Sequence, residues 1–170
     1  TANNVETINM DVSGMTDGKT KTIAALTGNS VATLNLTGSS DTIFTATTGS
    51  SKLATISAGS FSGDLTLPAA VAALNQTITT GTGNDTVAMG ARLTAADTID
   101  LGGNSLIAGT ATTGSDTLTA TGNIGSVLAA SALNISNVEA YEQSIGAQAA
   151  TYIDASKLSG VSSLAFSNDT

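Results

Sequence analysis

The sequence lacks several residue types on which common functional sites depend. It has no cysteine and no histidine, which excludes disulfides, thiolate and imidazole chemistry, and zinc sites of the usual kind. Tryptophan is absent, and aromatic residues make up only 3% of the 170 positions. The core must therefore be built from Val, Ile, Leu and Ala, which suits narrow, evenly stacked layers.

Charged side chains are scarce as well, at 11%, and they are unevenly divided. Five are basic and thirteen are acidic, which gives a formal charge of −8. This balance argues against nucleic acid and anionic membranes as partners, and it agrees with cations as ligands. The sequence shows no signal peptide and no apolar run long enough to span a bilayer. We expect a single domain over residues 1–170 that is a fragment of a larger protein.

Short stretches that alternate apolar and polar residues recur along the chain. They lie about 20 to 26 residues apart, and clusters of Gly, Ser, Asn and Asp separate them as turn signals. One coil of a parallel β-helix or β-roll has this length, and such coils form a core only by stacking. The repeated stretches are 4–10, 30–36, 52–57, 137–142 and 160–166.

The sequence therefore predicts an all-β solenoid with coils of about 20–26 residues. An antiparallel sandwich is the alternative, because it also has many short strands and turns, but the likeness among the repeats favours stacked coils. Two Ala-rich segments, 67–74 and 124–133, are expected to form short helical insertions. The residues expected to point inward are Val5, Ile8, Met10, Val31, Leu34, Leu36, Leu53, Ile56, Leu65, Leu67, Val87, Ile99, Leu101, Leu118, Val138 and Leu164.

One stretch carries a chemical signature. Residues 80–88, Thr-Gly-Thr-Gly-Asn-Asp-Thr-Val-Ala, nearly match the calcium-binding nonapeptide G-G-x-G-x-D-x-U-x. The glycines of such a turn allow φ > 0, so that carbonyl oxygens converge on a hard cation while the aspartate supplies charge. Asp85 is the charged candidate ligand, with Thr80, Thr82 and Asn84 beside it. The alternative is an ordinary surface turn, because Gly, Asn and Asp dominate turns for backbone reasons.

Three more aspartates, Asp41, Asp97 and Asp116, occur in the same Asp-Thr-apolar phrase as Asp85. In each phrase we expect the Asp to end a turn and the residue two positions later to enter the core. Carboxylates from successive coils would then repel one another unless calcium lies between them or the corners are offset. Asp100 is expected to cap the same site from the next coil. The alternative for each is a turn aspartate that binds its own backbone.

The run from Thr80 to Glu142 resembles the repeat region of bacterial surface-layer (S-layer) proteins of the type I-secreted kind, which carry RTX-like calcium motifs. The residues that carry the resemblance are 81–87, 114–118 and 135–141. The last of these, Ile-Ser-Asn-Val-Glu-Ala-Tyr, is similar to the N-V-E-x-L-N-L strand of such proteins. The tandem G-G-x-G-x-D run is absent, and Thr80, Ala111 and Ser39 replace motif glycines. Fewer or weaker calcium sites should follow.

The resemblance implies a right-handed parallel β-helix with calcium (Ca²⁺) at its coil corners. It also implies secretion to the extracellular cell surface and self-association into a two-dimensional lattice. Contact with cell-surface polysaccharide would belong to other parts of the parent protein. We therefore expect a structural, non-enzymatic segment of an S-layer protein.

Two other functional classes were weighed against this one. An adhesive or ice-binding solenoid could use the Thr-x-Thr units at 45–47, 77–79, 110–112 and 117–121, although their irregular spacing counts against a regular array. A polysaccharide-degrading enzyme would need clustered carboxylates with a Lys or Arg in a groove, and the basic residues are scattered. Glu139 and Glu142 are expected to form a solvated face rather than a catalytic pair.

Overall fold

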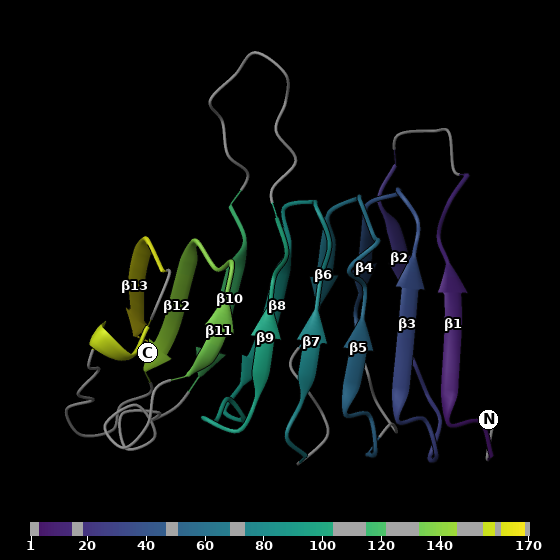
Figure 1. The fold of residues 1–170 in the computed structure, drawn as a ribbon, viewed down its shortest axis with the longest axis horizontal. Helices are drawn as coiled ribbons and strands as arrows, with labels where there is room; N and C mark the ends of the chain where they lie inside the picture. Colours follow the sequence, from purple (N-terminus) through teal and green to yellow (C-terminus); the bar gives the residue numbers. More distant parts are fainter. Residues whose placement is uncertain are drawn as a thin grey trace.

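The computed structural model describes residues 4–14, 19–46, 51–68, 74–103, 115–121, 133–145, 155–158 and 161–168. Within these residues the fold is a β-solenoid with two parallel sheets, and strands β1 to β12 alternate between the two sheets along the chain (Figure 1). Every strand pairing is parallel. The antiparallel sandwich is therefore excluded.

The first sheet, called sheet A, holds the odd-numbered strands up to β11. Its strands follow one another in chain order, and each one lies beside the strand of the next coil (Figure 1). These strands are β1 (Thr7–Asp11), β3 (Thr33–Thr37), β5 (Thr55–Ser57), β7 (Thr77–Thr79), β9 (Thr98–Asp100) and β11 (Asn134–Ser136).

The second sheet, called sheet B, holds the strands that complete each coil. A single 3-10 turn, η1 (Ala155–Lys157), precedes the last of them. The strands are β2 (Lys21–Ile23), β4 (Thr42–Phe44), β6 (Leu65–Leu67), β8 (Thr86–Gly90), β10 (Thr117–Thr121), β12 (Ala140–Ile145) and β13 (Ser163–Asn168).

The strand register confirms the predicted coil length. Thr7 pairs with Thr33, Thr33 with Thr55, Thr55 with Thr77 and Thr77 with Thr98, in steps of 26, 22, 22 and 21 residues. The step from Thr98 to Asn134 is longer, at 36 residues. In Figure 1 the strands of sheet A run upward in front and those of sheet B return behind them, so the coil is right-handed.

Side chains from both sheets meet between them and form a continuous core. Twelve of the residues expected to point inward are buried there: Val31, Leu34, Leu36, Leu53, Ile56, Leu65, Leu67, Val87, Ile99, Leu101, Leu118 and Val138. The four exceptions lie in the first and last coils. Ile8 and Met10 are half-buried, Val5 is 40% exposed and Leu164 is 38% exposed, because a terminal coil has a neighbour on one side only.

Two expectations need correction. Leu67 ends strand β6 rather than opening a helix, while residues 69–73 and 124–132 of the expected helical segments lie outside the described residues. In the phrase that begins at Asp41, the residue two positions later, Ile43, is 36% exposed, and Phe44 enters the core instead. None of the helical structure in the described part of the chain is long and apolar enough to cross a membrane.

Candidate functional site

The predicted calcium turn lies where the chain passes from sheet A to sheet B. We call this side of the solenoid the A-to-B corner; its described residues are 12–14, 19–20, 38–41, 58–64, 80–85, 101–103, 115–116 and 137–139. The residues that follow Asp85 behave as predicted, because Thr86 opens β8 and Val87 points into the core.

Gly81 and Gly83 are needed at this corner for space rather than for a left-handed backbone. Neither Gly81 nor Gly83 has a positive φ, contrary to the expectation for a calcium-binding turn. A Cβ on Gly81 would overlap the carbonyl oxygen of Phe61, and one on Gly83 would overlap that of Gly63. The two glycines of the motif therefore allow the backbones of successive coils to touch.

A first series of side chains links each coil forward to the next one. Oδ1 of Asp41 accepts the N–H of Asp64 at 3.0 Å, and Oδ1 of Asp64 accepts that of Asn84 at 2.7 Å. Oδ1 of Asn84 in turn accepts the N–H of Ser115 at 3.1 Å. We call this series the outer ladder, because all four of its members, Asp41, Asp64, Asn84 and Ser115, are exposed to solvent.

A second series, the inner ladder, points the other way along the solenoid. Oδ1 of Asp85 accepts the N–H of Leu65 in the preceding coil at 2.8 Å. Oδ1 of Asp116 accepts the N–H of Asp85 at 2.7 Å, and Oε2 of Glu139 accepts that of Asp116 at 2.9 Å. The acidic members Asp85, Asp116 and Glu139 therefore come from three successive coils; the stacked-corner prediction included Asp85 and Asp116 but not Glu139.

The register explains why Asp41 belongs to the outer ladder. Ile43 pairs with Thr66, which pairs with Thr86, so Thr42 and not Asp41 is level with Asp85. The shared Asp-Thr phrase is thus displaced by one residue in this coil. A displacement of one residue moves a strand side chain to the other face of its sheet, which is why Asp41 is exposed and Asp85 is buried.

Asp85 has no exposed surface, and both of its carboxylate oxygens accept backbone hydrogen bonds. Oδ2 accepts the N–H of Gly81 at 3.2 Å, in addition to the bond from Leu65 to Oδ1. Burial raises the pKa of Asp85, whereas Thr80 and the two N–H groups oppose this shift. The Thr80 hydroxyl lies close enough to act on the carboxylate but outside hydrogen-bond geometry.

Asp116 is also fully buried, but only one of its oxygens is paired. Oδ1 accepts the N–H of Asp85, whereas no residue in the described part of the chain donates a hydrogen bond to the buried Oδ2. Burial raises the pKa of Asp116 to about 7, the N–H of Asp85 opposes the shift, and the charges of Asp85 and Glu139 add to it.

The other predicted ligands lie elsewhere. Asp97 is buried ahead of β9, where Oδ1 accepts the N–H of Gln76 and Oδ2 accepts the N–H and hydroxyl of Thr94. Asp100 ends β9, and its Oδ1 accepts bonds from Gly102 and Asn137. Thr82 is exposed at the corner. The structure thus brings together Asp85 and Asp116, with Asn84 and Asp41 alongside. Asp97 lies where the chain passes from sheet B to sheet A, and Asp100 lies at the start of the A-to-B corner, where it bonds to Asn137.

The fit to calcium differs between the two buried aspartates. N–H donors already occupy both oxygens of Asp85, so this carboxylate fits a backbone acceptor better than a cation ligand. Asp116 retains an unpaired oxygen next to the carboxylate of Glu139, which is a donor set that calcium accepts. In the described part of the chain, no three His, Cys, Asp or Glu side chains converge as a metal site would need.

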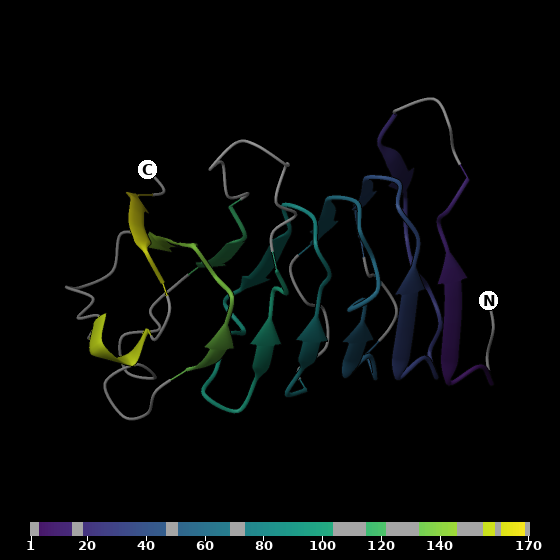
Figure 2. The ribbon, with the colours of Figure 1, turned by 45° about the horizontal axis from the view of Figure 1, so that its top comes forward.

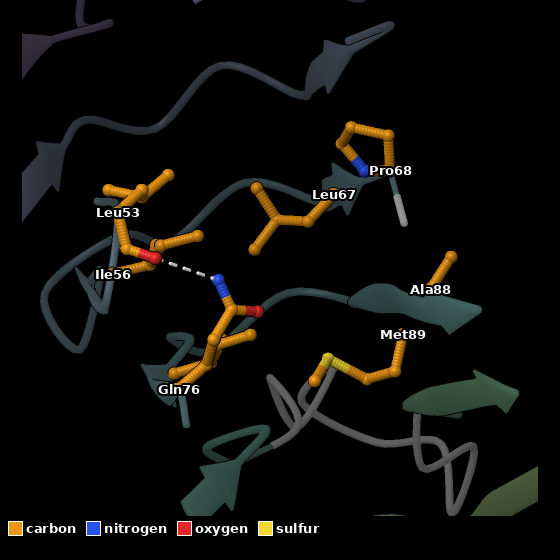
Figure 3. Close-up of a pocket in the computed structure, with 8 residues that line it drawn as sticks. Leu53, Ile56, Leu67, Pro68, Gln76, Ala88 and Met89 are labelled. Carbon is orange, nitrogen blue, oxygen red and sulfur yellow. Dashed lines mark hydrogen bonds between the residues drawn. The ribbon is translucent and has the colours of Figure 1, made fainter. Parts of the chain in front are cut away.

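A cavity between the sheets offers no substrate site. It has a volume of about 10 Å³ and is lined mainly by apolar side chains, with Gln76 as the polar group (Figure 3). Nε2 of Gln76 donates to the carbonyl of Leu53 at 3.0 Å, while Oε1 has no hydrogen-bond partner among the residues that the structure describes. This volume is on the order of that needed for one water molecule.

Sequence reasoning missed Glu139, which was expected on a solvated face. The structure places it at the corner, half-buried, three residues before the exposed Glu142. The available signal was its position one coil after Asp116, immediately before a strand.

No family model matches this chain, and no curated protein or solved structure matches it significantly.

Proposed function

We propose that this chain is a structural, non-enzymatic segment of a bacterial S-layer protein that is secreted to the cell surface. In this proposal the stacked coils form a stiff unit, and copies of it join into a lattice. The observation that carries the proposal is the regular stack of parallel coils (Figure 2), whose corners bring carboxylates from three successive coils together.

The C-terminal end exposes the larger apolar surface. Leu164 and Phe166 on β13 are 38% and 52% exposed, although they pair in register with the buried Tyr141 and Gln143 of β12. At the other end Ile8 and Met10 pair with the buried Leu34 and Leu36.

Calcium would stabilise the corners in this function. The proposal has two supports: the near-match of residues 80–88 to the calcium nonapeptide and the stack of carboxylates at the A-to-B corner. Binding of an extracellular cation to the folded state alone would raise stability by mass action. Cell-surface polysaccharide would be contacted by other parts of a longer parent protein.

Analytical ultracentrifugation across a concentration series tests the lattice proposal. The chain should self-associate, and Leu164→Ser combined with Phe166→Ser should shift the equilibrium toward the monomer. Ile43→Ser is the matched control, because Ile43 is 36% exposed on β4 away from either end. A chain that stays monomeric at all concentrations, or an equal effect of the control, would overturn the proposal.

A second candidate function, ice binding or adhesion, is favoured by one specific observation. Five threonines, Thr7, Thr33, Thr55, Thr77 and Thr98, stand in register on the outer side of sheet A. The expected Thr-x-Thr units do not form this array, since Thr77–Thr79 lies in sheet A and Thr117–Thr121 in sheet B. Strand spacing places neighbouring threonines about 4.8 Å apart, which forms one regular row of hydroxyls.

Thermal hysteresis measurements separate this candidate from the lattice function. An ice-binding row would give hysteresis that Thr55→Lys abolishes, whereas the control Thr66→Lys, on the outer side of sheet B, would leave it unchanged. An absence of hysteresis in the unmodified chain would overturn ice binding.

A further inference from the structure

We propose that Asp116 and Glu139 together hold a calcium ion, with Oδ2 of Asp116 as the buried ligand and the Glu139 carboxylate as its partner from the next coil. This inference rests on the calcium-stabilised function proposed above and gives that function a specific site. It places the ion one coil beyond the nonapeptide turn, and it adds a ligand that the motif does not contain.

The unpaired oxygen of Asp116 is the first observation. The residue has no exposed surface, and its Oδ1 is taken by the N–H of Asp85 at 2.7 Å. No described residue donates a hydrogen bond to Oδ2, and the carboxylate of Glu139 lies within hydrogen-bonding reach of the Asp116 carboxylate. Leaving a buried polar atom unsatisfied costs about 1 to 3 kcal/mol, and more when the group is charged. A bound cation would remove this cost by supplying the missing partner.

The position of Glu139 is the second observation. Its Oε2 accepts the N–H of Asp116 at 2.9 Å, which holds the carboxylate beside that of Asp116. The negative charges of Asp85 and Glu139 both act on Asp116, and no Lys or Arg is among the groups that do. Glu139 is half-buried, so the pair has access to solvent and therefore to an ion.

Asp85 contributes charge to this site but no ligand atom. Both of its oxygens already accept N–H groups, from Leu65 and Gly81. Three carboxylates from successive coils therefore contribute negative charge at this site. Only two of them, those of Asp116 and Glu139, have oxygens that are free to bind the ion.

The chemistry of the donors selects the class of ion. Carboxylate oxygens suit hard cations, and the absence of His and Cys excludes the usual zinc donors. Calcium accepts six to eight oxygens in flexible geometry, so carbonyl oxygens and water can complete the shell around two carboxylates. With so few charged ligands we expect a dissociation constant of about 10⁻⁴ to 10⁻³ M, the range of extracellular modules.

Isothermal titration of the folded 170-residue chain with calcium chloride, after removal of EDTA, tests the site. Glu139→Gln keeps an oxygen for the N–H of Asp116 and removes only the charge, and Asp116→Asn does the same for the N–H of Asp85. Glu142→Gln is the matched control, because it removes the same charge from an exposed residue three positions further along.

We expect calcium to bind to the unmodified chain and to Glu142→Gln with affinities within about twofold of each other. Each of the other two variants should lose at least tenfold in affinity, and calcium should no longer raise its melting temperature. No binding to the unmodified chain, or equal losses in Glu142→Gln and Glu139→Gln, would overturn the site. Self-association measured in EDTA shows separately whether the lattice function survives such a failure.

Discussion

The backbone N–H of Asp85 donates to Oδ1 of Asp116 at 2.7 Å, across 31 residues of sequence. The carboxylate oxygen replaces the backbone carbonyl oxygen that would accept this N–H within a sheet, because the series of backbone hydrogen bonds between strands is interrupted at the corner. Because the same arrangement recurs with Leu65 and Asp85, and with Asp116 and Glu139, acidic side chains satisfy the inner backbone of the corner from coil to coil.

Asp85→Ala should be strongly destabilising. The variant leaves the buried N–H groups of Leu65 and Gly81 without an acceptor, and each loss costs about 1 to 3 kcal/mol. We expect a fall of about 2 to 4 kcal/mol in the free energy of unfolding, measured by urea titration. Asp41→Ala is the control, since Asp41 is exposed and caps a single exposed N–H; a fall of similar size in both variants would contradict the role of burial.

Gly81→Ala should disrupt the stack of backbones. Its Cβ would overlap the carbonyl oxygen of Phe61, which is backbone and cannot swing aside. We expect a loss of stability of about 2 kcal/mol or more, in the range of overpacked sites. Gly103→Ala is the control, because a Cβ there meets nothing within 4 Å. Equal melting temperatures for the two variants would show that the coils do not touch at Gly81.

Stability in EDTA should fall as the pH rises from about 4 to about 7. The pKa of Asp116 is about 7 in the folded chain, against an ordinary value of 3.8. In this interval the folded state retains a proton that the unfolded chain has released, so raising the pH favours unfolding, and the effect levels off above pH 7. The raised pKa of Asp85 acts in the same direction.

Asp116→Asn is the control for this pH dependence, because it removes the titrating carboxyl and keeps an acceptor oxygen. Urea unfolding at several pH values should give a flatter profile for this variant than for the unmodified chain. Identical profiles would show that Asp116 does not bind the proton.

Tyr141 should resist ionisation until the chain unfolds. It is fully buried, and its hydroxyl donates to Oε1 of Gln143 at 2.8 Å; burial raises its pKa above the ordinary value. The difference in ultraviolet titration between the unmodified chain and Tyr141→Phe isolates its signal, which should coincide with loss of β-structure. Tyr141→Phe should also cost about 1 kcal/mol of stability for the lost hydrogen bond.

The sequence predicted the repeating part of the fold well, because each coil restates the same alternation. Leu34, Ile56 and Ile99 could be placed in the core from period alone, and they are buried there. The register of a single strand is less well determined. At Asp41 the local phrase matched Asp85, but Phe44 is larger than Ile43 and occupies the core, which shifts the pairing by one residue.

The corner was predicted in outline but not in its bonding. Asp-Thr phrases indicated that carboxylates would gather, and Asp85 and Asp116 do so. Which of their oxygens are paired depends on N–H groups 20 or more residues away, as at Leu65. That information is absent from any local motif. Glu139 was missed because its nearest acidic neighbour in sequence, Glu142, lies on an exposed face.

The two ladders run in opposite directions, so the coils that belong to both ladders are linked to each neighbour through side-chain oxygens. At its corner a coil both offers an oxygen to one neighbour and receives one from the other, as Asp64 and Asn84 do in one series and Asp85 and Asp116 do in the other. A duplication or deletion of one whole coil would again join backbone N–H donors to side-chain acceptors of the same kind. A duplication or deletion of part of a coil would leave the donors and acceptors of both ladders unmatched. Such a rod can therefore lengthen or shorten in evolution by whole coils without rebuilding its corners.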